Sequence, residues 1–234
     1  MATLEGMGLL SSSMTFVHMH ATDPDEWAMV ANAGAGVSFT PDTELQMGMN
    51  WPLTEVARAY GIAQSYGIDI TSNNSADFYV CLRMALQQAR CRENVRANGE
   101  QLVLGVPFSC AEALAWGTID AARSVGMEER IGSLTPGKQA DLQLLRMDDL
   151  TTIGWDKSNP EGSVIMQGQA RNVDTVMVSG RLVKRHGQVL ADIRHACSLL
   201  SDANERVTRE VNARGGYLLP LEEALSKIEL TSRN

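Results

Sequence analysis

The chain is predicted to be an α/β protein, because strand and helix patterns alternate through its first half. Apolar strand patterns lie over residues 14–18, 36–40 and 67–71, and a helical pattern follows each of them. This alternation is typical of βαβ units, which hold their strands parallel. The alternation then stops, and a hairpin pattern over residues 173–184 predicts a separate small β-unit.

Each element of the first half has a local justification. Residues 14–18 read Met-Thr-Phe-Val-His, which is rich in strand-forming side chains. The next helix is expected to begin at Thr22-Asp23-Pro24, a capping side chain followed by proline, and to end near Gly34. The remaining expected elements are a strand over 36–40, a loop over 42–51, a short helix over 52–60, a strand over 67–71 and a longer helix over about 76–92.

The second half begins with a capping box, Ser109-Cys-Ala-Glu112, which predicts a helix to about residue 123. The hairpin turn is expected at Ser179-Gly180. The other expected elements are a strand over 140–145, a polar stretch over 154–162, a charged helix over 202–211, a break at Gly215-Gly216 and a final short helix.

Composition excludes several classes of protein. A hydrophobic content of 44% is that of a globular chain, and 234 residues allow one large domain, even a closed (β/α)8 barrel of about 250 residues. A net charge of −8 argues against binding to nucleic acid or to an anionic membrane. The four cysteines form no C-x-x-C pair, and no stretch reaches the length of a membrane span. Because the start also lacks the basic residues of a secretory signal, we expect a cytoplasmic protein.

Two side chains fall where ligands bind in parallel sheets. His18 and Asp69 lie at or near the carboxyl ends of the first and third predicted strands. On a strand, His18 and His20 would point to the same side and could share one metal, although a histidine that is only hydrogen-bonded gives the same pattern. A carboxylate in an apolar strand is costly unless it is paired or binds a cation, but Asp69 would equally suit a turn.

The loop after the second strand offers further candidates for substrate contacts. Glu44 and Asp42 lie on it, and as loop acids they would also suit a purely solvated position. Trp51 and the neighbouring methionines could line an apolar pocket or pack in the core. His186 and His195 lie in or after the hairpin, away from the strand ends, and are not expected to take part.

Five segments resemble one known family in their order, their spacing and the identity of their residues. They read VHMHATDPDEW (17–27), GVSFTPDTELQMG (36–48), GID (67–69), IGSLTPGKQAD (131–141) and NVDTVMVSG (172–180). Over about residues 5–195 the chain resembles the amidohydrolase superfamily, near its cytosine deaminases, S-adenosylhomocysteine deaminases and triazine chlorohydrolases.

The resemblance implies a fold and its boundaries. His18 matches the histidine that ends the sixth strand of the family's (β/α)8 TIM barrel, and Asp69, 51 residues later, matches the aspartate that ends the eighth. The expected architecture is therefore a partial barrel, strands six to eight with their helices, over 1–127. Part of a small β-sandwich is expected over 128–190 and a helical tail over 191–234. The family's first-strand H-x-H would lie upstream, which leaves His20 as a pocket or packing residue.

The resemblance also implies a chemistry. In the family a divalent metal, zinc or iron, is held by the first-strand H-x-H, a fifth-strand histidine and the aspartate matching Asp69, which also moves a proton. The residue matching His18 orients the attacked group of a small heterocyclic substrate, whose C–N or C–Cl bond is hydrolysed. Because this chain offers only Asp69 as a family metal ligand, it is not expected to hold the metal stably. Phe39 lies where some relatives carry a polar residue, which would favour an apolar or aromatic substrate.

Three readings of the short chain remain open. It is one half of an amidohydrolase-type enzyme whose amino-terminal half precedes it, a catalytically inactive fragment that acts by protein association, or one chain of a split enzyme. An open three-stranded sheet has edges and apolar faces that seek partners, so a homo-oligomer or the missing half is the expected partner.

Overall fold

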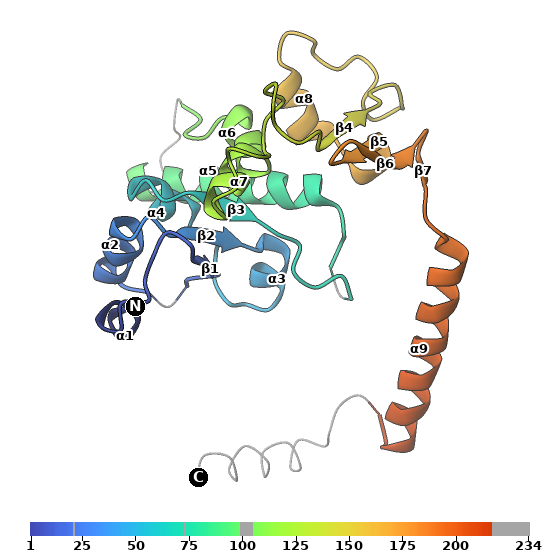
Figure 1. Cartoon of the computed structure of the whole chain (residues 1–234), viewed down its shortest axis with the longest axis horizontal. Helices are drawn as coiled ribbons and strands as arrows, with labels where there is room; N and C mark the ends of the chain where they lie inside the picture. The colour runs from blue at the N-terminus through green and yellow to red at the C-terminus, as the bar shows by residue number, and fades with distance from the viewer. Residues whose placement is uncertain (21, 73, 99–104, 217–234) are drawn as a thin grey trace. The chain divides into compact units, whose positions relative to one another are not determined.

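The computed structural model describes residues 1–20, 22–72, 74–98 and 105–216 (Figure 1). Residue contacts divide the chain into two units, Met1–Gln188 and Val189–Asn234, and each unit is described by itself. The final short helix expected after Gly215-Gly216 lies outside the described residues. The three-part domain division expected from the sequence stays a prediction.

A parallel three-stranded sheet lies in the amino-terminal half of the first unit (Figure 1). Its strands are β1 (Thr15–Val17), β2 (Gly36–Phe39) and β3 (Gln64–Tyr66), in the order β1-β2-β3. Thr15 pairs with Gly36 and Val37 pairs with Gln64, both in parallel register. The parallel arrangement predicted from the alternating pattern is therefore confirmed.

The helices of this half begin at identifiable signals. The structure has α1 (Ala2–Gly6), α2 (Pro24–Asn32), α3 (Pro41–Gln46), α4 (Thr54–Ala59) and α5 (Phe78–Asn98). Asp23 caps α2 as expected, since its carboxylate accepts the Glu26 N–H at 2.9 Å. The prediction of a loop over 42–51 was wrong in its first half. Pro41 occupies the first turn of α3, where its missing N–H costs nothing, and so begins a helix there.

The third strand lies earlier than the sequence predicts. The expected strand over 67–71 was placed on its isoleucines, whereas the observed β3 is polar and buried. Its side chains are satisfied internally: the Tyr66 hydroxyl lies 2.8 Å from the Thr54 hydroxyl, and the Ser65 hydroxyl donates to the Val37 carbonyl at 3.2 Å. Buried polar groups are tolerated when they are hydrogen-bonded, so hydrophobicity alone misplaces this strand.

After α5 the chain forms two short helices. The capping box at Ser109 is confirmed, with the Glu112 N–H bonded to the Ser109 hydroxyl at 3.1 Å and the Ser109 N–H to the Glu112 carboxylate at 2.8 Å. The single helix expected to residue 123 is instead α6 (Cys110–Trp116) and α7 (Ile119–Ser124), separated by Gly117 and the non-helical Thr118. Glycine is a weak helix former, which explains the break.

A small antiparallel sheet follows. Its strands are β4 (Leu142–Leu145), β5 (Val173–Val178), β6 (Arg181–Arg185) and β7 (Gln188–Val189), in that order. The predicted hairpin is confirmed, and both turn residues, Ser179 and Gly180, have positive φ, as a tight hairpin requires. α8 (Pro160–Gln167) begins within the predicted polar stretch, capped by the Asn159 side chain, and continues past its end. A short 3-10 turn (Ala170–Asn172) precedes β5.

One hydrophobic core joins the parallel sheet to its helices. Aromatic rings lie at its centre: Tyr66 packs 5.9 Å from Phe39 and 5.2 Å from Trp116, and Phe108 lies 5.8 Å from Trp116, measured between ring centroids. The other large buried members are Trp27, Val30, Val37, Ile62, Leu82, Leu86 and Ile165.

Alanine at Gly36 tests how closely α7 approaches the sheet. A Cβ at Gly36 would lie 2.5 Å from the Ser124 carbonyl oxygen and 2.8 Å from its Cα, too close for real atoms. We expect Gly36→Ala to lower the free energy of unfolding by about 1–3 kcal/mol in urea titration, as overpacking does. Gly105→Ala is the matched control, because a Cβ there meets no atom of the described residues within 4 Å. Equal stability of the two variants would contradict the observed packing.

The described part of the second unit is a helix, α9 (Ile193–Ala213). It begins nine residues before the predicted helix, because Asp192 caps it by accepting the His195 N–H at 3.0 Å. It buries none of its residues. None of the described helices has the length and apolar character needed to cross a membrane.

Candidate active site

The carboxyl ends of the three parallel strands carry the polar residues of the candidate site. His18 directly follows β1, Thr40 follows β2, and Asp69 comes three residues after β3. Because parallel strands end at the same edge of a sheet, these residues lie on one side of it, where ligands bind in this architecture. His18 lies at the end of the first strand, as predicted, whereas Asp69, predicted within a strand over 67–71, lies three residues beyond the end of β3.

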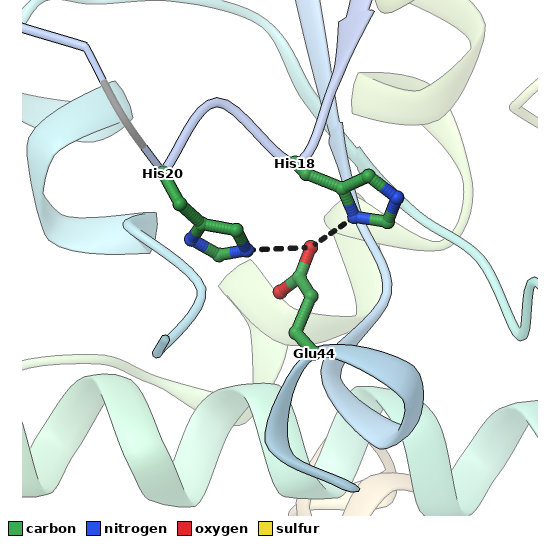
Figure 2. A group of neighbouring side chains, drawn as sticks. All are labelled: His18, His20 and Glu44. Atoms are coloured by element: carbon green, nitrogen blue, oxygen red, sulfur yellow. Dashed lines mark hydrogen bonds and ion pairs between the residues drawn. The ribbon is translucent and has the colours of Figure 1, made fainter. Parts of the chain in front are cut away.

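Glu44, from α3, occupies the centre of a hydrogen-bonded group (Figure 2). Its side chain is 0% exposed, and its Oε1 accepts the Thr40 N–H at 2.9 Å. The same oxygen lies 2.9 Å from Nδ1 of His18, and the Thr40 hydroxyl lies 3.2 Å from that nitrogen. Glu44 is in the first turn of α3, where a carboxylate also meets the positive end of the helix dipole.

His20 reaches the same carboxylate from the other side (Figure 2). Its Nε2 lies 3.4 Å from Glu44 Oε1, and its ring stacks against that of His18 with centroids 6.1 Å apart. The two histidines were predicted to point to the same side of one strand, but β1 ends before His18. The positive φ angles of His18 (71°) and Met19 (48°) turn the chain so that both imidazoles meet one acid. Such strained backbone is held by its surroundings and clusters at functional sites.

The hydrogen bond to Glu44 fixes the orientation of His18. A carboxylate oxygen only accepts, so the hydrogen is assigned to Nδ1 of His18, and in the neutral ring Nε2 is left as a free acceptor. Figure 2 shows this second nitrogen pointing away from Glu44. The His18 side chain is 28% exposed, so Nε2 is available to a small molecule at the strand ends.

Three ionisable side chains of this part of the fold have raised pKa values. Burial raises the pKa of the Cys81 thiol to about 12, with the acids Asp42 and Glu44 adding to the rise. Burial also raises the pKa of Tyr66 well above its usual value, and it raises the pKa of Asp42. Desolvation therefore disfavours the charged forms of these three side chains.

Asp69 stands apart from this group. It is exposed, has a positive φ of 56°, and forms no hydrogen bond with another described residue. It is not a member of the close His18–His20–Glu44 cluster. Its roles as a catalytic residue and metal ligand stay predictions, as does the catalytic role of His18.

The other predicted substrate contacts occupy different environments. Phe39 is fully buried in the core against Tyr66, whereas Trp51 is 48% exposed. Glu44, expected on a loop, is buried and contacts His18. Substrate contacts by Phe39, Glu44 and Trp51 all stay predictions.

His20 is the residue of the cluster that the sequence undervalued. The resemblance implies a pocket or packing residue there, and the structure adds its position, with the His20 side chain 9% exposed and Nε2 3.4 Å from Glu44 Oε1. The H-x-H spacing was the available signal. It was set aside because the pair does not match the family's first-strand motif.

The family assignment follows from comparison with known proteins. The model of the Amidohydrolase family matches residues 2–183, and the chain therefore belongs to this family. The 5-methylthioadenosine/S-adenosylhomocysteine deaminase of Teredinibacter turnerae is 32% identical over 185 residues, which is 77% of this chain and 39% of the relative. The 8-oxoguanine deaminase of Pseudomonas aeruginosa is 29% identical over 178 residues, 76% of this chain and 36% of the relative. The chain thus spans about two-fifths of the length of the curated relatives it matches.

Solved structures show the same fold. An adenosine deaminase from Xanthomonas campestris with bound zinc superposes with a TM-score of 0.74 at 24% identity, over 89% of this chain and 45% of the other. The atrazine chlorohydrolase of Arthrobacter aurescens, complexed with zinc, gives 0.71 at 22% identity, over 86% and 43%.

Proposed function

We propose that this chain is the carboxy-terminal part of a metal-dependent amidohydrolase that hydrolyses a C–N bond of a small amino-substituted heterocycle. The observation that carries the proposal is the position of His18 and Asp69 in a chain of this family, at the carboxyl ends of the first and third strands of a parallel sheet. The deaminase names of the curated relatives support the reaction class.

The unpaired edges of the parallel sheet support the proposal that this chain carries only part of the active site. Among the described residues, β1 and β3 each pair only with β2, so both outer edges of the parallel sheet lack a strand partner. A barrel of eight strands has no such edges. We infer that the remaining strands come from a preceding or separate segment and complete a (β/α)8 barrel around these three.

The family's metal fits this chain only in part. The exposed Asp69 carboxylate has no hydrogen-bonding partner among the described residues and is available to a cation. A catalytic zinc takes three protein ligands as a rule, so the completing segment would supply the others. When bound, a divalent metal lowers the pKa of water and makes a nucleophile available at neutral pH.

The chain's own residues then have distinct tasks. Asp69 would be one of the ligands of the metal and would accept the proton that the attacking water releases. His18, held by Glu44 through Nδ1, would direct Nε2 at the attacked part of the substrate. Glu44 is a positioning residue, because its carboxylate is buried beneath His18.

The test is a substrate panel on the completed enzyme. Ammonia release is measured from 5′-methylthioadenosine, S-adenosylhomocysteine, 8-oxoguanine and isoxanthopterin, the compounds named by the relatives. Release from at least one amino heterocycle supports the proposal. A completed, folded and metal-loaded enzyme that releases no ammonia from the panel favours the second candidate, an inactive fragment that acts through protein association across the unpaired sheet edges.

A further inference from the structure

Three metal-ligating side chains of this chain converge without help from any other segment. His18, His20 and Glu44 each offer one ligand atom, and these atoms all lie within 4.8 Å of one another (Figure 2). Two imidazoles and one carboxylate form a donor set that holds zinc in known hydrolases. None of the three is the aspartate expected to bind the family's metal.

The spacing suits a tetrahedral ion. Zinc lies about 2.0–2.2 Å from nitrogen and oxygen ligands, which places two ligands of a tetrahedral site about 3.4 Å apart. The His20 Nε2 to Glu44 Oε1 distance is 3.4 Å. The His18 Nδ1 to Glu44 Oε1 distance is 2.9 Å, so that pair would open by a few tenths of an ångström.

Three buried polar atoms of this group have no hydrogen-bond partner among the described residues. They are the two ring nitrogens of His20 and Oε2 of Glu44. The side chains are 9% and 0% exposed. An unsatisfied buried polar group costs about 1–3 kcal/mol, and more when it is charged, so a bound cation would remove a real penalty.

We propose that His18, His20 and Glu44 bind one zinc ion, in a site separate from the metal position at Asp69 and complete within this chain. The two imidazoles favour zinc over magnesium or calcium, which prefer oxygen ligands. The partly exposed His18 leaves a side open for entry and for a water as fourth ligand. Zinc on Nδ1 replaces the proton that His18 donates to Glu44, so this occupied state and the hydrogen-bonded state described above exclude each other. The site needs no part of the proposed function.

The first experiment uses the full 234-residue chain, purified without a histidine tag and stripped with chelator. Equilibrium dialysis against zinc is read by elemental analysis, and the imidazole nitrogens are followed by NMR. About one zinc per chain is expected, with shifts at His18 and His20 and none at His186 and His195. Because it uses the wild-type chain, this measurement does not depend on whether variants fold.

Variants then assign the ligands. His20→Asn and Glu44→Gln are expected to weaken zinc binding at least about tenfold, because loss of a residue that only supports a ligand already costs about 10–100-fold. His195→Asn is the matched control and should bind as the wild type does. A Cys91→Ser/Cys197→Ser double variant removes the two exposed thiols and should also retain zinc. Circular dichroism confirms that each variant is folded.

Three results would overturn the proposal. They are no stoichiometric zinc in the folded wild-type chain, NMR shifts confined to His186 and His195, and unchanged zinc affinity in folded His20→Asn. None of these results measures ammonia release by the completed enzyme, so failure of the zinc site leaves the proposed function standing.

Discussion

Alanine at Glu44 is expected to lower the free energy of unfolding of the metal-free chain by about 2–4 kcal/mol. The change removes the acceptor of the Thr40 N–H and of His18 Nδ1 and leaves a cavity in a fully buried position. One effect opposes this loss. Oε2 of Glu44 is buried without a hydrogen-bond partner, so its removal also removes an unfavourable contribution to stability. Two lost hydrogen bonds and a cavity outweigh that single relief.

The measurement is urea unfolding followed by tryptophan fluorescence, with chelator present. The free energy of unfolding should fall less than half as much in Glu44→Gln as in Glu44→Ala, because the glutamine amide oxygen still accepts the Thr40 N–H. Glu5→Ala, at an exposed acid of α1, is the control and should leave the midpoint unchanged. If Glu44→Ala unfolds at the wild-type midpoint, the hydrogen-bonded cluster does not contribute to the fold as described.

Asparagine at Asp69 is expected to have the opposite profile, a large loss of activity with little loss of stability. In the completed enzyme, turnover should fall about 10²–10⁴-fold, the contribution of a positioned proton-transfer group. Stability of the isolated chain should stay within about 0.5 kcal/mol, as at other surface positions. Asp69 is exposed and forms no hydrogen bond with another described residue, so the described contacts do not depend on its charge.

Steady-state ammonia release and urea unfolding are measured on the same Asp69→Asn protein. Asp25→Asn, at another exposed acid, is the matched control and should retain activity. Wild-type turnover in Asp69→Asn would remove this residue from the proposed mechanism.

The parallel sheet was predictable because two of its strands follow simple rules. β1 and β2 are short runs rich in strand-forming residues, and Pro41 follows shortly after β2. β3 was misplaced because Gln64, Ser65 and Tyr66 are buried through hydrogen bonds, which no hydrophobicity pattern reveals. The missed helix α3 depended on the position of Pro41 in a stretch that reads as a loop.

The candidate site was predictable only where strand ends define it. His18 and Asp69 are candidates because they lie at or near the carboxyl ends of predicted strands, and that inference needs only the order of elements. The convergence of His20 and Glu44 depends on left-handed backbone at His18 and Met19, which sequence patterns do not indicate in non-glycine residues. Glu44 was assigned to a solvated loop or a substrate contact, whereas its buried position depends on the packing of α3.

The most direct test of the central claim is complementation. The claim is that this chain carries one part of an amidohydrolase site that a second segment completes. The second segment is the reading frame upstream of Met1 or, in its absence, the amino-terminal part of the Teredinibacter turnerae relative. Ammonia release is measured for each part alone, for the two mixed, and for a single-chain fusion. The account predicts activity only when both parts are present, abolished by Asp69→Asn. Folded, metal-supplied parts that stay inactive both mixed and fused would contradict it.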